Sequence, residues 1–325
     1  MNSTSAQPSS RLFLALAGST ALLTLGLIIF GAVVRVTDSG LGCGSDWPLC
    51  DGRIIPPLDN ITAWIEWLHR LFAVLIGLMG LATLTVAIRA YRKRDRMVLN
   101  YTVAAAVLFA IQSALGAIVV IFELPPTFVT LHLGTAMLLL GALLVATVVV
   151  WYKPQTRVQQ VRDGLPVLVY ANAALSLVII LTGALVRGSG ATLACTDWPL
   201  CNGEILPMAQ GQLAMIHMIH RFAVLALGVS LLILVWQVMR LRRDPLVRNL
   251  ALASFVVYLL QVGVGALYVL SVAGPEWGAA HVGMAATTWA LLVILSVVEA
   301  LNSSEIENER AELAWNQASS TNPQS

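Results

Sequence analysis

Eight apolar stretches, each about 20 residues long, are the feature that most limits how this 325-residue chain can fold. Their approximate bounds are 13–34, 64–88, 98–121, 128–151, 165–186, 213–239, 247–271 and 279–300. A segment of this length and character crosses a hydrocarbon core of roughly 30 Å as an α-helix. Inside lipid each backbone amide must be hydrogen-bonded within its own segment, and the period-2 alternation of a membrane barrel is absent. The sequence therefore predicts an all-α integral membrane protein of eight transmembrane helices.

The composition agrees with a membrane protein and argues against a soluble one. Apolar residues make up 58% of the chain and charged residues only 11%, whereas a soluble domain carries about 25% charged residues. A surface this poor in charge would aggregate in water, so the natural solvent is a bilayer. The net charge of +2 gives no reason to expect a nucleic-acid partner. The first stretch, 13–34, is too long for a signal-peptide core and lacks a following cleavage site, so a retained helix is expected.

Positive charge is concentrated in the connections after the second, fourth and sixth stretches. The basic residues there are Arg89, Arg92, Lys93, Arg94 and Arg96; Lys153, Arg157 and Arg162; and Arg240, Arg242, Arg243 and Arg248. The positive-inside rule places these connections in the cytoplasm, together with both termini and the 153–164 linker. The loops 35–63 and 187–212 then lie outside a bacterial-type inner membrane. The tails are predicted as a cytoplasmic segment 1–12 and a disordered cytoplasmic segment 301–325.

An internal repeat relates the two halves of the chain. Residues 31–50 read GAVVRVTDSGLGCGSDWPLC, and residues 183–201 read GALVRGSGATLACTDWPLC. Further pairs at offsets between 149 and 152 residues are Leu68-His69-Arg70 with Ile219-His220-Arg221, Gln112 with Gln261, Gly116-Ala117 with Gly265-Ala266, and His132-Leu133-Gly134 with His281-Val282-Gly283. Because each unit contains an even number of helices, both units point the same way across the membrane. The sequence predicts two parallel four-helix bundles, 13–152 and 165–300.

Four of the five histidines occupy equivalent positions in the two units. His69 and His132 lie about five residues into the second and fourth stretches, which both run inward from the outer face. His220 and His281 repeat this arrangement in the second unit. Two neutral imidazoles that face each other across a bundle suit the axial positions of a haem iron, whereas zinc would require four ligands. The alternative is that each histidine only hydrogen-bonds between helices, but two pairs at equal depth favour haem.

The position three residues before the first histidine of each pair differs between the units. It is Glu66 in the first unit and His217, the fifth histidine, in the second. The spacing places each side chain on the histidine face of its helix, one turn nearer the outside. A carboxyl group beside a haem edge can accept a proton or orient water, so Glu66 is the candidate catalytic residue; an acid that only lines the mouth is the alternative. His217 is expected to contact a propionate or a neighbouring ligand rather than the iron.

Four arginines near the outer face are candidates for binding haem propionates. Arg35 and Arg187 end the first and fifth stretches. Arg70 and Arg221 directly follow the first histidine of each pair. Guanidinium groups bind paired carboxylates well, and arginine at an outer boundary runs against the positive-inside bias. Ordinary snorkelling of these long side chains to the interface is the alternative.

All four cysteines lie in the predicted external loops, where each pair brackets an Asp-Trp-Pro-Leu segment. The pairs are Cys43 with Cys50 and Cys195 with Cys201. An oxidising outer compartment makes two disulfides within the loops the default expectation. A reversible dithiol that takes part in redox chemistry or haem transfer is the alternative, although no Cys-x-x-Cys spacing is present.

The combination of these features resembles the haem A synthase family, membrane enzymes that convert haem O to haem A. The resemblance covers about residues 12–300 and is carried by Gly31-Ala32-Val33-Val34-Arg35, the Cys43–Cys50 loop, Glu66-x-x-His69-Arg70, His132, and the copies that end at His220 and His281. It implies oxidation of a methyl substituent of haem O to a formyl group. It also implies that the substrate haem lies in the first half with His69, His132 and Glu66, and that a haem b cofactor lies in the second half with His220 and His281. In cysteine-containing members of the family the cysteine pair of the first loop is associated with activity.

The same resemblance implies partners in cytochrome oxidase biogenesis. These are a haem O synthase upstream, an electron acceptor or donor, and a terminal oxidase downstream. Association of several copies of this chain into a homo-oligomer is a further alternative. Two other functions would also use four paired histidines, namely a b-type cytochrome that only carries electrons and a haem carrier or exporter. Against the cytochrome, both predicted haem sites lie near the outer face, so the iron centres do not form a stack across the bilayer. Product analysis separates the three functions, because only the enzyme changes the haem.

Overall fold

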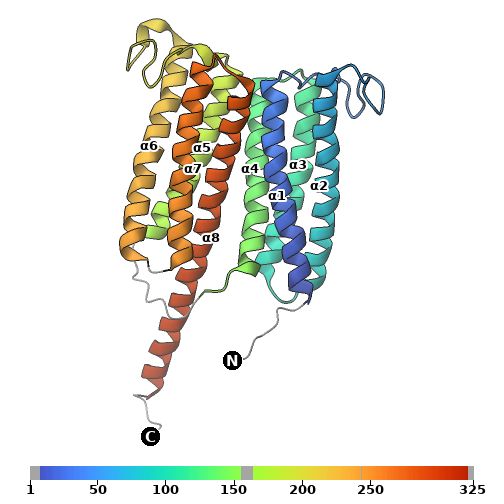
Figure 1. Cartoon of the computed structure of the whole chain (residues 1–325). Coiled ribbons are helices and arrows are strands. Elements are labelled where there is room, and N and C mark those ends of the chain that lie inside the picture. Colours follow the sequence, from blue (N-terminus) through green and yellow to red (C-terminus); the bar gives the residue numbers. More distant parts are fainter. Residues whose placement is uncertain (1–7, 155–163, 243, 321–325) are drawn as a thin grey trace.

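The structure is a computed structural model that describes residues 8–154, 164–242 and 244–320, and long helices dominate it (Figure 1). In chain order the long helices are α1 (Pro8–Val36), α2 (Ile61–Tyr91), α3 (Arg96–Ile121), α4 (Pro126–Trp151), α5 (Leu165–Gly188), α6 (Gln212–Leu241), α7 (Pro245–Leu270) and α8 (Pro275–Ser320). Two short 3₁₀ helices, η1 (Ala191–Leu193) and η2 (Met208–Gln210), lie in the loop between α5 and α6. Within the described residues, eight helices are long and apolar enough to cross a membrane, which confirms the predicted class.

Local sequence signals determine where several helices begin. Asn60 caps α2, because its side-chain oxygen accepts a hydrogen bond from the Ala63 amide at 3.1 Å. Asp95 caps α3 and Asp244 caps α7 in the same way. The α4 helix begins at Pro126. Proline is favourable there because the first residue of a helix does not use its backbone N–H in a helical hydrogen bond. The α2–α3, α3–α4, α6–α7 and α7–α8 connections are only a few residues long, so these consecutive helices run antiparallel beside each other.

The helices form two groups that lie side by side, α1–α4 and α5–α8 (Figure 1). Contacts between the groups are made by α1 with α8, by α4 with α5 and by α4 with α8. At the α4–α8 contact the Trp289 indole lies against Gly141, where a Cβ atom would come within 2.8 Å of the ring. A buried apolar cluster with members from all eight helices closes the end of the molecule where the chain enters α1. The two groups therefore share one packed core.

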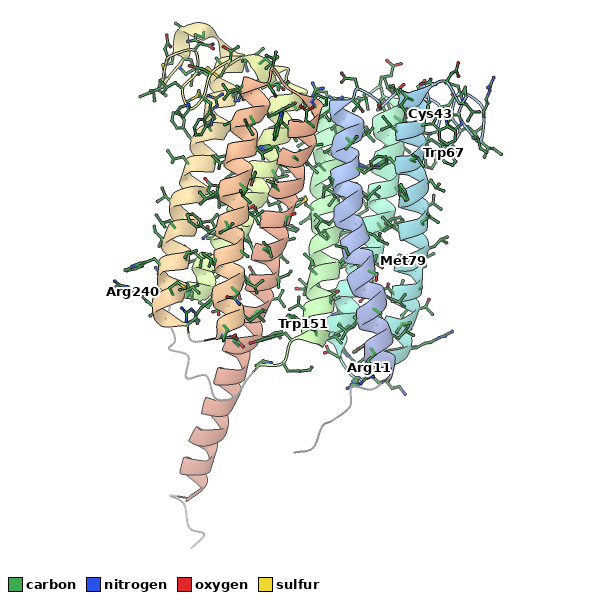
Figure 2. The ribbon with its side chains drawn as sticks, in the orientation of Figure 1. Arg11, Cys43, Trp67, Met79, Trp151 and Arg240 are labelled. Carbon is green, nitrogen blue, oxygen red and sulfur yellow. A yellow bond between two sulfur atoms is a disulfide. The ribbon has the colours of Figure 1, made fainter. Side chains whose placement is uncertain are left out.

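Both cysteine loops lie at one end of the molecule, named here the disulfide end. Figure 2 shows Cys43 and Trp67 at this end, Arg11, Trp151 and Arg240 near the opposite end, and Met79 between them. The basic connections of the sequence therefore share the end opposite the cysteines. Their assignment to the cytoplasm stays a prediction.

A polar network at this opposite end joins the two groups of helices. Arg242 and Glu299 are 3% and 0% exposed and form an ion pair with 2.9 Å between Nη2 and Oε2. The Tyr152 hydroxyl lies 2.9 Å from Asp244 Oδ2 and 2.9 Å from Asn302 Oδ1. Tyr152 follows α4, whereas Asp244 and Asn302 belong to the second group. Burial, followed by the nearby Asp244 carboxylate, raises the pKa of Tyr152 to about 12.

The structure corrects the sequence-based boundaries at the tails. The α1 helix begins at Pro8, within the predicted tail 1–12. The α8 helix continues to Ser320, so the prediction of disorder from residue 301 is wrong for residues 301–320. These residues contain neither Gly nor Pro and are rich in good helix formers, which explains the extension. Most of the predicted 153–164 linker lies outside the described residues, as do residues 321–325.

Candidate functional site

The first histidine of each pair lies against a glycine of the preceding helix in its bundle. His69 of α2 packs on Gly31 of α1, where a Cβ atom would come within 3.1 Å of the imidazole Cε1. His220 of α6 packs on Gly183 of α5, and the corresponding distance is 3.2 Å. A larger side chain at either glycine would push the ring out of place, because interiors are close-packed. Sequence reasoning used these glycines only as markers of the repeat, and their contact becomes visible once the helices are paired.

The second histidine of each pair also lies against a glycine. His132 of α4 packs on Gly116 of α3, where an added Cβ atom would be 3.3 Å from Cε1. His281 of α8 packs on Gly265 of α7, where the corresponding distance is 2.8 Å. All four imidazoles therefore pack in the same way, with the ring against the backbone of a neighbouring helix at a glycine.

The structure brings the predicted histidines together as pairs within each bundle. His69 and His132 lie in the first turns of α2 and α4, and His220 and His281 lie in the first turns of α6 and α8, so each bundle holds two of them near the disulfide end. From the helix starts and a rise of about 1.5 Å per residue, the histidines lie roughly 9–12 Å from the disulfide end. In the described part of the chain no group of three or more His, Cys, Asp or Glu side chains is placed to hold a metal ion.

Hydrogen bonding differs between the two pairs. In the second bundle His220 Nδ1 lies 3.0 Å from the Thr182 hydroxyl, and His281 Nδ1 lies 3.1 Å from the Gln261 carbonyl oxygen. A metal-binding histidine commonly uses one ring nitrogen for the metal while the other is fixed by such a bond. Both rings of the second bundle therefore present Nε2 as the atom left for a ligand. Sequence reasoning paired Gln112 with Gln261 as a repeat but missed this carbonyl contact.

In the first bundle the rings are held less firmly. His132 Nε2 lies 3.0 Å from the Gln112 side-chain amide nitrogen. The Nδ1 atom of His69 is buried and has no hydrogen-bond partner, whereas the backbone of Gln112 interacts with His132 as the backbone of Gln261 does with His281. A buried polar atom without a partner is unfavourable, so His69 is the least firmly fixed of the four rings. Both pairs fit a haem iron, and the second pair is better prepared for one.

Glu66 lies between α2 and the first cysteine loop, with only 3% of its surface exposed. Its Oε2 accepts a hydrogen bond from the Cys43 amide at 2.9 Å, and its Oε1 accepts one from Arg70 Nη2. Arg70 Nη1 also donates to the carbonyl oxygens of Asp46 and Leu49, at 3.1 and 2.8 Å. The loop, the arginine and the carboxylate therefore form one connected unit one helical turn from His69. The predicted propionate contact of Arg70 stays a prediction, and its observed partners are these groups.

The second bundle repeats this unit without the carboxylate. His217 replaces Glu66 and is 6% exposed, with Nε2 3.4 Å from Arg221 Nη2 and with Nδ1 buried and unpartnered. Arg221 Nη1 donates to the carbonyl oxygens of Pro199 and Leu200, as Arg70 does in the other loop. The two loops are therefore clamped alike, and the presence of an acid distinguishes the first site.

The remaining candidate arginines, Arg35 and Arg187, meet between the two bundles. Arg187 Nη2 donates to the carbonyl oxygen of Arg35 at 3.5 Å and to Asp38 Oδ1 at 3.0 Å. The Arg187 Nε atom is buried without a partner. This contact links the ends of α1 and α5 at the disulfide end, which sequence spacing alone did not indicate.

Both predicted disulfides are present, Cys43–Cys50 and Cys195–Cys201. Their sulfur-bearing residues are at most 1% exposed. In the first loop the indole nitrogens of Trp64 and Trp67 donate to the carbonyl oxygens of Pro57 and Ile54, which fastens the loop to α2. A redox function for either pair stays a prediction.

Comparison with known proteins places these features in a family. Residues 15–293 match the family COX15-CtaA, described as cytochrome oxidase assembly protein. A protein of Symbiobacterium thermophilum named heme A synthase is 32% identical over 285 residues, which cover 85% of this chain and 92% of that protein. Another of the same name, from Halalkalibacterium halodurans, is 37% identical over 223 residues, covering 66% and 74% of the two chains. A third, from an Exiguobacterium species, is 33% identical over 260 residues, covering 78% and 83%. The chain belongs to the COX15-CtaA family of cytochrome oxidase assembly proteins.

Proposed function

We propose that this chain is the oxidoreductase that converts haem O to haem A, with the substrate in the first bundle and haem b in the second. The proposal rests on family membership and on the unequal hydrogen bonding of the two histidine pairs. Oxidation of a methyl group to a formyl group removes protons and electrons and adds oxygen. Such a reaction needs a redox centre and a proton acceptor, and one bundle offers a firmly held ligand pair while the other offers a carboxylate.

The second bundle suits a resident haem. Thr182 and Gln261 hold His220 and His281 through Nδ1, so both rings are positioned before any ligand arrives. Preorganised ligands favour tight binding, because little ordering remains to be done on binding. A haem b held there supplies a one-electron redox centre near the first bundle.

The first bundle suits a haem that must enter and leave. Its His69 lacks a partner on Nδ1, and His132 Nε2 is engaged by the Gln112 side chain. Coordination by these rings therefore requires a local rearrangement, which lowers affinity and permits exchange of substrate and product.

Glu66 is the proposed proton acceptor of this reaction. The Cys43 amide and Arg70 donate to its two oxygens and fix their orientation. Its position one turn from His69 places it near the outer edge of a ring held by that histidine. Glu66 could then accept a proton at Oε1 or Oε2, or orient a water molecule toward the ring.

The proposed function also implies an orientation in the membrane and a set of partners. The disulfide loops would face the outside of a bacterial inner membrane, and the basic connections and both termini would face the cytoplasm. A haem O synthase would supply the substrate and an external electron acceptor would remove electrons. A haem-A-containing oxidase would receive the product.

The test is extraction and mass analysis of haems from membranes that contain this protein and a haem O synthase. Haem A, or its hydroxylated precursor, is the expected new product. Glu66→Gln should abolish most of this product at equal protein level, and His69→Ala and His132→Ala should remove the haem O spectrum of the first site. Unaltered haem O beside a folded protein loaded with haem b would overturn the enzyme assignment in favour of an electron carrier or haem carrier.

A further inference from the structure

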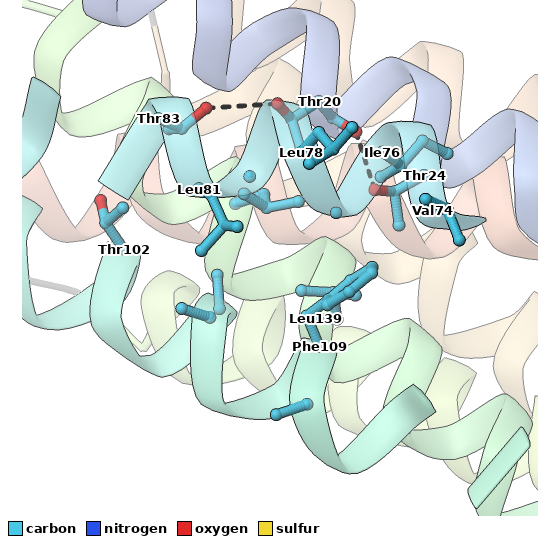
Figure 3. A pocket seen from close by; sticks show the side chains of 16 residues that line it. Thr20, Thr24, Val74, Ile76, Leu78, Leu81, Thr83, Thr102, Phe109 and Leu139 are labelled. Carbon is cyan, nitrogen blue, oxygen red and sulfur yellow. Dashed lines mark hydrogen bonds between the residues drawn. The ribbon is translucent and has the colours of Figure 1, made fainter. Parts of the chain in front are cut away.

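A cavity of about 390 Å³ lies inside the first bundle, in contact with α1, α2, α3 and α4 (Figure 3). This volume falls within the range of about 300–1,000 Å³ typical of small-molecule pockets. The polar side chains of its wall are threonines, namely Thr20, Thr24, Thr83 and Thr102. Each threonine hydroxyl donates to a carbonyl oxygen of its own helix. The cavity therefore offers an apolar surface to its occupant.

The cavity begins below the first histidine pair, on the side away from the disulfide end. Val74 in its wall follows His69 by five residues, and Leu139 follows His132 by seven. With a helical rise of about 1.5 Å per residue, the cavity starts roughly 8–10 Å from the imidazoles. A flat ring between the histidines would thus meet the cavity at its inner edge.

One side of the cavity is formed by an exposed face of α2. Val74, Leu78 and Leu81 line the cavity and are about 60% exposed. Gly80 also lines it, and a Cβ atom added there would meet no other atom within 4 Å. The cavity therefore opens toward the lipid-facing side of the bundle and has room at Gly80.

At three positions of this cavity the sequence repeat pairs a smaller residue with a larger one in the second half. Gly80 corresponds to Leu231 and Thr83 to Leu234, and both leucines are completely buried. Ala106 of α3 corresponds to Phe255 of α7, a partly buried member of the apolar core. At these three positions the second bundle therefore carries the larger side chains, and two of them are completely buried.

One helix–helix contact is the same in both bundles, so the two bundles differ in side chains and not in the approach of these helices. Phe109 lies against Gly77, where an added Cβ atom would be 2.7 Å from the ring. Tyr258 lies against Gly228 at the matching positions of the second bundle, where an added Cβ atom would be 2.5 Å from the hydroxyl oxygen and 3.0 Å from the ring carbon Cζ. The helices approach alike in both bundles, so the cavity follows from side-chain size.

We propose that this cavity holds the hydroxyethylfarnesyl tail of haem O and thereby selects haem O over haem B in the first bundle. The inference rests on the proposed function and adds a subsite to it. Haem O carries its charged propionates on one half of the ring and its long isoprenoid tail on the other. A ring whose propionates face the disulfide end directs the tail inward, to the apolar cavity. Haem b has no such tail. The proposed haem b site in the second bundle therefore needs no tail cavity, in agreement with the larger residues Leu231, Leu234 and Phe255 there.

The experiment compares haem O and haem B binding to the full-length protein at the site that is lost in His69→Ala/His132→Ala. The variants are Gly80→Leu and Ala106→Phe, which introduce the residues of the second half from two different helices. Each should weaken haem O binding by about tenfold or more, because apolar burial of the tail is lost, and leave haem B binding unchanged. Gly80→Ala should have an intermediate effect. The matched control is Gly26→Leu, at an exposed glycine of α1 where an added Cβ atom also meets nothing.

Size-exclusion elution and the thermal midpoint identify variants that have folded. Folded Gly80→Leu and Ala106→Phe proteins that bind haem O as tightly as the wild type would overturn the tail subsite and leave the proposed function intact. Equal loss of haem O and haem B would also overturn it, because the cavity would then serve the ring. If the wild type bound no haem through His69 and His132, the proposed function itself would fail, and the subsite with it.

Discussion

Arg70 connects the buried Glu66 carboxylate to the first cysteine loop. One guanidinium nitrogen donates to Glu66 Oε1, while the other donates to the Leu49 carbonyl oxygen at 2.8 Å. The candidate catalytic acid is therefore positioned by a loop outside the helices as well as by its own helix. The loop is part of the site, and changes in it should affect the chemistry.

Arg70→Ala should reduce haem A formation by about tenfold or more at equal protein level. The substitution removes the cation beside Glu66 and the three carbonyl contacts that hold the loop, and charge-assisted hydrogen bonds are the stronger ones. Product yield from membranes that supply haem O measures the effect. Arg53→Ala, at an exposed residue of the same loop, is the control and should keep wild-type yield.

The two disulfides should differ in their effect on activity. Cys43→Ser/Cys50→Ser should lower haem A formation more than Cys195→Ser/Cys201→Ser, because the Cys43–Cys50 disulfide holds the loop whose Cys43 amide donates to the Glu66 carboxylate. Both changes should lower stability by about 2 kcal/mol, as expected for a disulfide that closes a short loop. Product yield and thermal midpoints measure the two effects. Equal yields from the two double variants would contradict a link between the first loop and Glu66.

Gly265→Val should displace His281 and empty the second haem site. An added Cβ atom at this position lies 2.8 Å from the imidazole Cε1, closer than real Cβ contacts allow. The absorption spectrum of the purified protein should lose most of its bis-histidine haem signal. Gly263→Val is the matched control, since Gly263 lies on the same helix and its added Cβ atom meets nothing within 4 Å. Retention of the signal in Gly265→Val would argue against His281 as a ligand.

Glu299→Gln should strongly destabilise the protein. The change replaces the carboxylate that pairs with the buried Arg242 guanidinium by a neutral amide, and removing one charge of a buried pair typically costs about 3–5 kcal/mol. The thermal midpoint in detergent or nanodiscs should fall by several degrees. Glu204→Gln, an exposed loop carboxylate, should leave the midpoint unchanged.

The Tyr152 network should make stability depend on alkaline pH. The pKa of this phenol is raised from 10.0 to about 12 in the folded protein, so folding favours the protonated form. Its contribution is complete below pH 10 and is lost as pH rises toward 12. The difference in thermal midpoint between the wild type and Tyr152→Phe should therefore shrink across this interval. A constant difference from pH 9 to pH 12 would contradict the assignment.

Much of the fold was predictable because membrane spans leave strong signals in sequence. The eight helices follow from length and hydropathy, and the disulfides follow from one cysteine pair within each of two predicted external loops. The α8 extension to Ser320 was missed, since a polar segment of good helix formers gives no hydropathy signal. Such a segment reads as a tail unless its helix propensity is weighed together with the helix before it.

The candidate site was predictable in its residues but not in its hydrogen bonds. His69, His132, His220 and His281 stand out by repetition, but the bond from His281 to a backbone carbonyl leaves no trace in residue types. The same holds for the cavity, because the sequence shows that Gly80 in the first half corresponds to Leu231 in the second half. Its meaning depends on how side chains of four helices meet, and this requires three-dimensional packing.

The exposed face of α2 beside Gly80 has a kinetic consequence. A substrate that reaches the cavity through this face arrives from the bilayer, so its relevant concentration is its mole fraction in lipid. Added lipid should then dilute the substrate and slow the reaction at fixed amounts of enzyme and haem, whereas added buffer should not. Supply of haem O would be governed by surface dilution, and a neighbouring membrane enzyme could raise the local mole fraction without raising any concentration in water.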